Sequence, residues 1–375
     1  MAERRLPELD GIRGLAILLV LVWHYVAAPG GLLPPDTMGG ALYRAGILTW
    51  SGVDLFFVLS GFLIGGILMD AKASPVFFRT FYLRRAFRIL PLYFVLCVFG
   101  TLIVMSAGWG SVVGKPMPFY VYATFTQNFW LAHHPWDRYM EVTWSLAVEE
   151  QFYLTLPLLV RFLPAKRLPI AIGALAMASA AGRTLFYLRN GNEWGAAAYT
   201  SVFCRADALM LGALGAWVVR QPQLRTLLGQ KRGILRAIIA VTGMGVLVLQ
   251  YQGWTMQTRP MSTLGYSWLA MFYLSLLLLA VVASDGWWAW LMRLAPLRSL
   301  GTVAYCVYLL HETIYSVVGW LLRGQTHPRG FDPGVAATAV GATLVLSFLS
   351  WRFFESRMIR IGHRFTYATA SPGAA

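Results

Sequence analysis

Arg13 and His24 lie in one apolar stretch of the sequence and are the first candidates for chemistry. They are eleven residues apart, so on a helix they share one face at depths that differ by roughly 16 Å. The residues between them are almost all Leu, Val, Ile and Ala, which predicts a membrane span. Ionisable groups inside a span are energetically unfavourable and usually serve function. The pair therefore indicates a site that binds an anion near one membrane surface and does proton chemistry deeper inside.

Four further ionisable residues fall inside predicted spans, at a depth similar to that of His24: Asp54, Glu149, Arg205 and His311. Such residues normally face the interior of a helical bundle or a water-filled cavity. We therefore expect them to share one polar pocket with His24. Two alternatives stay open from the residues alone: Glu149 and Arg205 pair only to hold helices together, and His311 makes only a packing hydrogen bond.

A second polar layer is predicted at the cytoplasmic surface. Arg13 opens the first span, and Arg84, Arg85 and Arg88 precede the third. The planar guanidinium group suits phosphate, although juxtamembrane arginines also anchor to anionic lipid. Together the two layers suit group transfer from a long donor with a phosphate head. His24 would act as general base or carry the group covalently, with Asp54 or Glu149 orienting it.

The composition identifies the class of protein that must position these residues. The chain has 375 residues, is 58% hydrophobic and 13% charged, and has a mean hydropathy of +0.59. A soluble domain would carry about twice that charge, so the sequence predicts an all-α polytopic membrane protein. The net charge of +15 does not indicate nucleic-acid binding, because the cations fall in short loops. The three cysteines are far apart and show neither disulfide nor metal spacing.

The apolar windows have the length of membrane spans and predict about ten transmembrane helices. Most of the 31 Lys and Arg residues lie on the side of the N-terminus, which places both termini in the cytoplasm. In this count of positive charges, Arg183 is assigned to the side of the membrane opposite the N-terminus. We expect one transmembrane domain over 1–360 and a short, disordered cytoplasmic tail over 361–375. The windows are 12–28, 49–69, 89–107, 143–163, 169–188, 199–219, 234–251, 265–284, 300–322 and 334–354.

At these residues the sequence closely resembles the acyltransferase-3 family of integral-membrane O-acyltransferases. The first helix of that family carries an Arg, ten intervening residues and a His, matched here by Arg13 and His24. One departure is that Glu355 is followed by Ser and Arg where the family often has Arg and Pro, which affects only a helix end. The remaining matches are residues 52–64, Arg85 with Arg88, Asn128, residues 143–153, Arg205 with Asp207, residues 308–311, and Phe354 with Glu355.

The resemblance implies a ten-helix fold, with acyl-CoA (acetyl-CoA above all) as the cytoplasmic donor. The acceptor it implies is a hydroxyl on a glycan, a lipid-linked sugar or a glycosylated metabolite, and the location a bacterial plasma membrane. No metal is expected. His24, with Glu149 and Asp54, is assigned to catalysis, and Arg13, Arg85 and Arg88 to the donor. The residues assigned to substrate binding are Asn128, Trp144, Ser145, Arg205 and His311.

The competing hypothesis is a proton-coupled transporter or exporter of sugars or organic acids, in which the buried His, Asp and Glu form a proton relay. Transporters often show inverted repeats with matched broken helices, and we find no such pair in the sequence. The acceptor and the acyl chain length stay open. The aromatic residues of the outer loop, about 108–142, are interpreted as interfacial anchors, with acceptor binding as the alternative.

Overall fold

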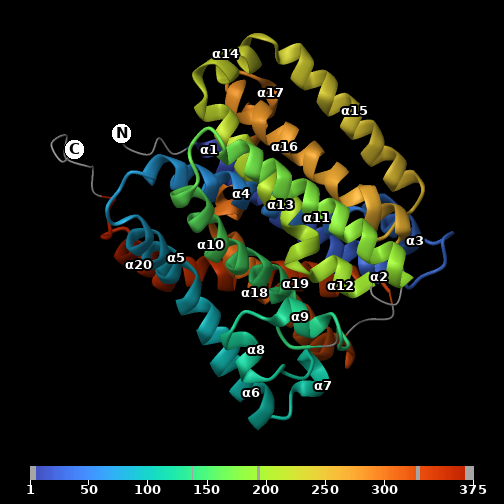
Figure 1. The fold of residues 1–375 in the computed structure, drawn as a ribbon. Helices are drawn as coiled ribbons and strands as arrows, with labels where there is room; N and C mark the ends of the chain where they lie inside the picture. The colour runs from blue at the N-terminus through green and yellow to red at the C-terminus, as the bar shows by residue number, and fades with distance from the viewer. Residues whose placement is uncertain (1–5, 137, 192–194, 327–329, 368–375) are drawn as a thin grey trace.

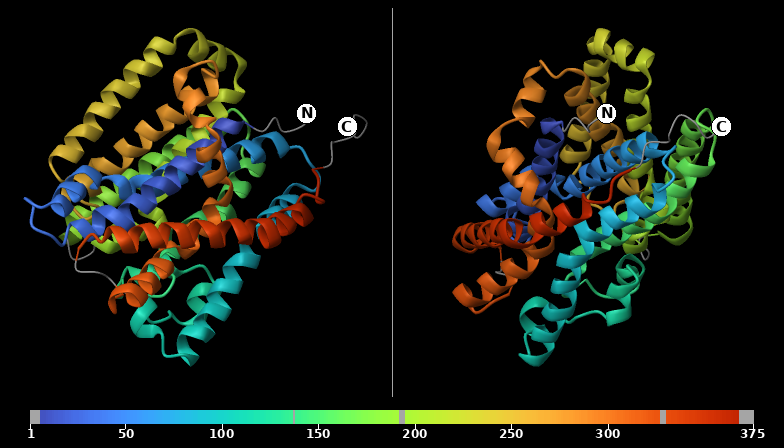
Figure 2. Two further views of the ribbon diagram at one scale, coloured as in Figure 1. Left: turned by 180° about the vertical axis from the view of Figure 1, so that it is seen from behind. Right: turned by 90° about the vertical axis from the view of Figure 1, so that its left-hand side faces the viewer.

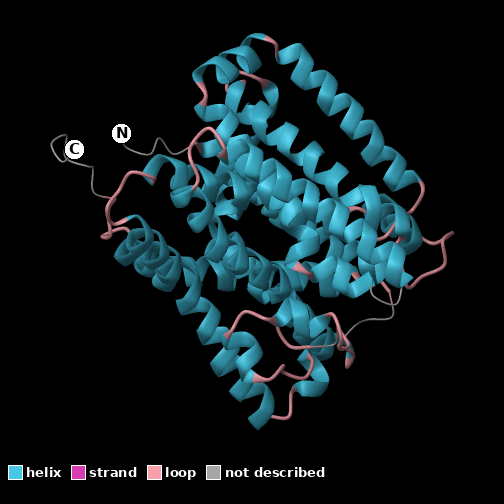
Figure 3. Ribbon diagram, in the orientation of Figure 1, coloured by secondary structure: helices cyan, strands magenta, loops and turns pink. Residues whose placement is uncertain are grey.

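The computed structural model describes residues 6–136, 138–191, 195–326 and 330–367. Within these ranges the chain forms helices joined by loops, and its one β-contact is an isolated bridge between Lys115 and Arg138 (Figure 3). The predicted all-α class is confirmed. Helices dominate because apolar runs that cross a bilayer must satisfy their backbone hydrogen bonds internally.

Each predicted window contains a long helix. Three of these helices continue through π-helical turns: α1 (Pro7–Val22) through η1 (Trp23–Ala27) into α2 (Ala28–Gly30), α5 (Phe77–Phe94) through η3 (Val95–Gly100) into α6 (Thr101–Ser106), and α19 (Pro333–Ser350) through η7 (Trp351–Glu355) into α20 (Ser356–Gly362). The others are α4 (Gly52–Ala71), α10 (Trp144–Phe162), α11 (Leu168–Asn190), α13 (Val202–Arg220), α15 (Arg232–Tyr251), α16 (Tyr266–Val282) and α18 (Ala295–Arg323).

Shorter elements connect these helices. They are α3 (Met38–Gly46), η2 (Thr49–Ser51), α7 (Gly110–Val113), α8 (Phe119–Ala123), α9 (Gln127–Leu131), η4 (Glu141–Thr143), α12 (Gly195–Thr200), α14 (Pro222–Gln230), η6 (Met261–Gly265) and α17 (Trp287–Met292).

Eight segments of the described chain are long and apolar enough to cross a membrane, which confirms a polytopic membrane protein. They do not include α10 and α18, whose interiors carry Glu149 with Glu150 and His311 with Glu312. Ten spans and a cytoplasmic location of both termini therefore stay predictions. We call the end of the bundle where α1 begins and α20 ends the inner end, and the end with α3, α9 and α12 the outer end (Figure 1, upper left and lower right).

Two helix pairs form the centre of the bundle, α1 with α18 and α4 with α13. Both pairs need glycine at the contact, because the backbone of one helix lies directly against the backbone of the other and leaves no room for a side chain. A Cβ atom on Gly301 of α18 would lie 1.8 Å from the carbonyl oxygen of Asp10, and one on Gly14 would lie 1.9 Å from that of Leu297. A Cβ atom on Gly61 of α4 would lie 1.9 Å from the carbonyl oxygen of Leu209 in α13. These contacts fix the helices that carry His24, Asp54, Arg205 and His311.

The periphery is arranged around this centre. Helices α14 and α15 lie along one edge beside α16, and α6, α7 and α8 form a lobe at the opposite edge (Figures 1 and 2). Helix α20 packs on α5 at the inner end. The predicted tail begins at residue 361, and its described part lies along α5, where the guanidinium of Arg84 donates to the Phe365 carbonyl at 2.7 Å. Residues 368–375 of that tail lie outside the described residues.

Candidate active site

His24 lies in the π-helical turn η1, in the outer half of the first long helix. Its Nδ1 is 2.9 Å from the carbonyl oxygen of Val20. A carbonyl only accepts hydrogen bonds, so Nδ1 carries a proton. Its Nε2 lies 3.0 Å from Oε1 of Glu312 in α18. π-helical turns often occur at functional sites, and the turn that holds His24 is one of several in the described chain.

Glu312 is the functional candidate that sequence reasoning missed. It follows His311 directly, inside the apolar window 300–322, and an ionisable residue in such a window was the available signal. The side chains of His24 and Glu312 are 25% and 29% exposed, although both lie within the helical bundle. This edge of the pair is therefore not covered by other protein atoms.

His311 completes a group that we call the His–Glu cluster: His24, His311 and Glu312. The two imidazole rings meet edge to face with centroids 4.7 Å apart. His311 is fully buried, its Nδ1 donates to the Tyr308 carbonyl at 2.7 Å, and its Nε2 has no hydrogen-bond partner in the described structure. Tyr25 donates to the carbonyl of His311 at 2.8 Å, which fixes this turn of α18 against the first helix.

The His–Glu cluster is also the place where a metal ion could bind. One potential ligand atom from each of its three residues lies within 4.8 Å of the others. Two imidazoles and a carboxylate are donors that zinc accepts. The same geometry equally suits a proton shared between an imidazole and a carboxylate.

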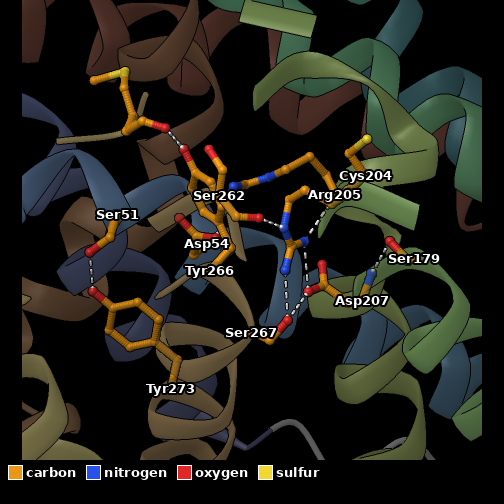
Figure 4. Close-up of polar contacts among 12 residues, drawn as sticks. Ser51, Asp54, Ser179, Cys204, Arg205, Asp207, Ser262, Tyr266, Ser267 and Tyr273 are labelled. Atoms are coloured by element: carbon orange, nitrogen blue, oxygen red, sulfur yellow. Dashed lines mark hydrogen bonds and ion pairs between the residues drawn. The ribbon is translucent and has the colours of Figure 1, made fainter. Parts of the chain in front are cut away.

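Asp54 and Arg205 form a buried ion pair between α4 and α13, with 2.7 Å between Asp54 Oδ1 and Arg205 Nη2 (Figure 4). Both side chains are 1% exposed. The alternative that Arg205 pairs with Glu149 is therefore wrong. Asp54 also does not orient His24, because Val20 and Glu312 occupy the two ring nitrogens of that imidazole.

Aromatic rings enclose the guanidinium of Arg205. Its central carbon lies 3.9 Å from the ring centroid of Tyr266, 5.3 Å from that of Tyr199 and 5.6 Å from that of Phe57. Its Nε and Nη1 have no hydrogen-bond partner in the described structure, and neither does Oδ2 of Asp54. Buried donors are normally satisfied, so this pair offers two unused donors and one unused acceptor to a ligand or water.

A second buried ion pair lies behind the first. Arg183 of α11 contacts Asp207 of α13 at 2.9 Å and donates to the hydroxyl of Ser267 at 2.7 Å and to the carbonyl of Ser262 at 3.0 Å. Figure 4 labels its partners Asp207, Ser267 and Ser262. The assignment of Arg183 to the outer surface was wrong, since its side chain is fully buried. A loop charge cannot be told from a charge paired inside the bundle when only the sequence is known. This network joins α11, α13 and α16 and so positions the helix that carries Arg205.

Glu149 lies between the polar layers. It accepts a hydrogen bond of 3.2 Å from Tyr153, whose hydroxyl also contacts Ser60. The charge of Glu149 interacts with Arg85 and Arg88 of α5 on one side and with Tyr308 of α18 on the other. The ring of Tyr308 is 5.7 Å from that of His311. Glu149 thus lies within electrostatic range of the inner arginines and of Tyr308, and a hydrogen bond joins it to Tyr153.

The inner layer brings Arg13, Arg85 and Arg88 together. The charge of Arg88 interacts with those of Arg13, Arg85 and Glu355, which come from α1, α5 and η7. Arg13 also pairs with Asp10 at 3.1 Å. Guanidinium groups donate in pairs to phosphate oxygens, so three of them near one another suit an anion with several phosphate oxygens.

The other predicted substrate residues make contacts within the protein. The Asn128 and Gln151 amides exchange hydrogen bonds of 3.0 and 3.1 Å, which attach α9 to α10. Ser145 shares a hydrogen bond of 2.6 Å with Tyr308 and attaches α10 to α18. The ring centroid of Trp144 lies 4.5 Å from that of Tyr199, whose ring faces the guanidinium of Arg205. Their roles toward a substrate stay predictions.

Comparison with known proteins places this geometry in a family. The model of the acyltransferase domain family matches residues 6–352. The chain is 27% identical to the peptidoglycan O-acetyltransferase OatA of Listeria monocytogenes, over 96% of this chain and 57% of the relative. It is 25% identical to the O-acetyltransferase OatA of Staphylococcus aureus, over 97% of this chain and 58% of the relative.

A further relative is the putative membrane-bound transacylase BcsY of Komagataeibacter xylinus, 27% identical over 100% of this chain and 88% of the relative. The chain spans somewhat more than half the length of the OatA proteins it matches. No solved structure matches it. Since the family model covers nearly all of the described helices, the resemblance seen in the motifs is confirmed, and the chain belongs to the acyltransferase-3 family as a multi-pass membrane protein.

Proposed function

We propose that this protein is a membrane O-acyltransferase. It moves a short acyl group, most of all acetyl, from cytoplasmic acyl-CoA to a hydroxyl of a cell-envelope glycan, a lipid-linked sugar or a glycosylated metabolite. The observation that carries the proposal is the contact between His24 and Glu312, inside a helical bundle whose inner end gathers three arginines. The names of the OatA relatives support acetyl as the group and peptidoglycan as the class of acceptor.

The donor is held at the inner end in this proposal. The phosphates of coenzyme A contact Arg13, Arg85 and Arg88, whose guanidinium groups donate in pairs to phosphate oxygens. Arg13 and His24 are about three helical turns apart on one helix, a separation of roughly 16 Å. The long, flexible pantetheine arm of coenzyme A is suited to carry a thioester over that separation.

The proton chemistry follows from the hydrogen bonds of His24. Because Nδ1 donates to Val20, the acceptor gives its proton to the pair that Nε2 forms with the carboxylate of Glu312. As the hydroxyl oxygen attacks the thioester carbonyl carbon, its proton moves to this pair, in which the carboxylate of Glu312 stabilises the imidazolium. The carbon–sulfur bond then breaks, and the thiolate of coenzyme A takes the proton back from the pair. The products are an ester and free coenzyme A, with no charge left on the protein.

A covalent route uses the same residues. Nε2 attacks the thioester itself, coenzyme A leaves, and the acyl-imidazole is then cleaved by the acceptor hydroxyl. Rapid acid quench of the enzyme with acetyl-CoA, followed by mass spectrometry of the peptide that contains His24, separates the two routes. An acetyl group on that peptide before acceptor is added indicates the covalent route.

The test uses the full chain in detergent, with acetyl-CoA and a panel of envelope glycans, and detects O-acetyl esters by mass spectrometry. His24→Ala is expected to abolish transfer, while His363→Ala, at an exposed histidine of the inner end, retains it. Detergent removes any ion gradient, so transfer under these conditions also argues against the proton-coupled transporter. Full transfer by His24→Ala would disprove the proposed role of the imidazole.

A further inference from the structure

The outer end of the molecule carries a shallow pocket of about 360 Å³, beyond the residues discussed so far. Its walls are residues 131–136, which follow α9, together with Ala196 of α12. That volume lies at the lower end of the range of small-molecule sites. The pocket belongs to the aromatic outer loop, for which the sequence leaves interfacial anchoring and acceptor binding as alternatives.

The walls of this pocket are fixed by contacts within the protein. The ring of His134 stacks on that of Trp130 at 3.8 Å, with an angle of 6° between the planes, and its Nδ1 donates to the Trp130 carbonyl at 2.8 Å. Thr200 of α12 donates to the carbonyl of Asn128 in α9 at 2.8 Å, which holds the two sides of the pocket together. A preformed pocket loses less entropy when a ligand binds.

Trp136 gives the pocket its chemical character. Its Nε1 is buried and has no hydrogen-bond partner in the described structure, so one N–H donor is unused. An indole offers a flat apolar face together with this donor, and a pyranose ring offers an apolar C–H face together with hydroxyl oxygens. Among the described residues of its walls there is no Lys or Arg, so a phosphate-bearing lipid headgroup would lack its usual counter-charge.

Packed aromatic side chains lie between the pocket and the ion pair of Asp54 and Arg205. Trp136 lies 6.0 Å from Tyr199 and 6.3 Å from Trp144, measured between ring centroids. Tyr199 in turn lies 5.3 Å from the guanidinium of Arg205, whose Nε and Nη1 are unused donors. A ligand that contacts Trp136 would therefore contact a residue that packs directly against the surroundings of Arg205.

We propose that this outer pocket is a carbohydrate-binding subsite, in which one uncharged sugar unit of the acceptor stacks on Trp136. The inference rests on the proposed function and adds where the acceptor binds. It assigns the specificity for the acceptor to the outer loop and leaves donor binding to the arginines at the inner end.

The test measures the acceptor and the donor separately, with a β-1,4-linked tetramer of N-acetylglucosamine as probe and acetyl-CoA as donor. Trp136→Ala is expected to raise the KM for the tetramer about tenfold, since it removes the main aromatic contact. The KM for acetyl-CoA and the kcat should stay within about twofold of wild type, since the arginines and His24 are untouched. Trp136→Phe keeps an aromatic face without the N–H and should give an intermediate KM.

The matched control is Trp109→Ala, at an outer tryptophan that contacts Trp320 instead of the pocket; it should leave both KM values unchanged. Saturation-transfer NMR with the same tetramer reports binding without turnover, and its signal should disappear in Trp136→Ala. An unchanged tetramer KM in Trp136→Ala would overturn the subsite, and so would an equal loss toward donor and acceptor. If wild-type protein acylates no glycan, the proposed function fails, while the NMR signal still decides whether the pocket binds sugar.

Discussion

The two ring nitrogens of His24 have different partners, and this difference determines what each can do. Nδ1 is occupied by the backbone of its own helix, whereas Nε2 meets the carboxylate of Glu312 on another helix. The orientation of the imidazole is therefore set by α1, and its charge state depends on α18. Residues that hold this turn of α18, such as Tyr25, act on the imidazole through position alone.

At the residue scale, we predict that Glu312→Gln lowers kcat by at least about 100-fold, because a neutral amide cannot stabilise the imidazolium. The KM values for donor and acceptor should change little, since the amide has nearly the size and hydrogen-bonding capacity of the carboxylate. Steady-state kinetics with acetyl-CoA and glycan measure kcat and the two KM values. Thr313→Ala alters the next position of the helix, which points about 100° away, and should keep wild-type kcat. A wild-type kcat in Glu312→Gln would reduce the pair to a structural contact.

At the scale of the helices, the site depends on how closely α1 and α18 approach. Gly301 lies against the backbone of Asp10, and the same two helices carry His24 and Glu312. A wider separation of these helices would lengthen the contact between imidazole and carboxylate. Catalytic geometry is thus coupled to glycines several turns away from the His–Glu cluster.

Gly301→Ala should therefore reduce both stability and activity. Its Cβ would lie 1.8 Å from the carbonyl oxygen of Asp10, so the helices must separate, and overpacking of this kind lowers stability by about 1–3 kcal/mol or more. Thermal unfolding in detergent, followed by size-exclusion chromatography, measures the loss. Gly173→Ala in α11 has no atom within 4 Å of the new methyl group and should be neutral or slightly stabilising. Equal melting temperatures of the two variants would contradict the packing argument.

A second prediction at this scale concerns the start of α19. Asp332 is its N-cap and accepts hydrogen bonds from the backbone N–H groups of Gly334 and Val335 at 2.9 and 3.1 Å. Asp332→Ala should destabilise the protein by about 1 kcal/mol, and Asp332→Asn by less, since Asn also caps helices. The same unfolding measurement distinguishes them. Equal losses in the Asn and Ala variants would mean that charge, and not the cap, holds this end of the helix.

The pH dependence of this cap has a definite sign. The hydrogen bond from Arg323, together with those from the backbone, lowers the pKa of Asp332 below its ordinary value of 3.8. The folded carboxylate thus stays ionised at a pH where the unfolded one is protonated. Its stabilisation is fully present above the ordinary pKa and is lost as the pH falls through the lowered value. The difference in melting temperature between wild type and Asp332→Asn should shrink over that range.

The apolar windows predicted the long helices, because an apolar run of that length has few other stable structures in a bilayer. Partners across helices were harder to predict. Asp54 was considered as a partner of His24, yet it pairs with Arg205, and Glu312 takes its place. An apolar window fixes depth to within a turn or two but not the rotation of the helix about its axis. The π-helical turn at His24 changes that rotation locally, and no feature of its sequence indicates such a turn.

At the scale of the whole molecule, the two polar layers and the outer pocket lie at different depths of one bundle. The arginines gather at the inner end, the His–Glu cluster lies deeper, and Trp136 lies at the outer end. In the proposed function, this order separates the place where the donor enters from the place where the acceptor binds. An acyl group would then cross most of the membrane while the charged coenzyme stays at the inner end.

Sealed proteoliposomes test this separation directly. Neither acetyl-CoA nor an oligosaccharide crosses a bilayer unaided, because their polar and charged groups would lose their hydration. With protein inserted in one orientation, acetyl-CoA on the side of Arg88 and glycan on the side of Trp136 should give esterified glycan, and the reverse placement should give none. His24→Ala in the same vesicles controls for leakage and for uncatalysed transfer. Both substrates can also be confined to the side of the membrane that Arg88 faces. Product formation there would contradict the transmembrane route, because the acceptor would then reach the imidazole through the donor entrance.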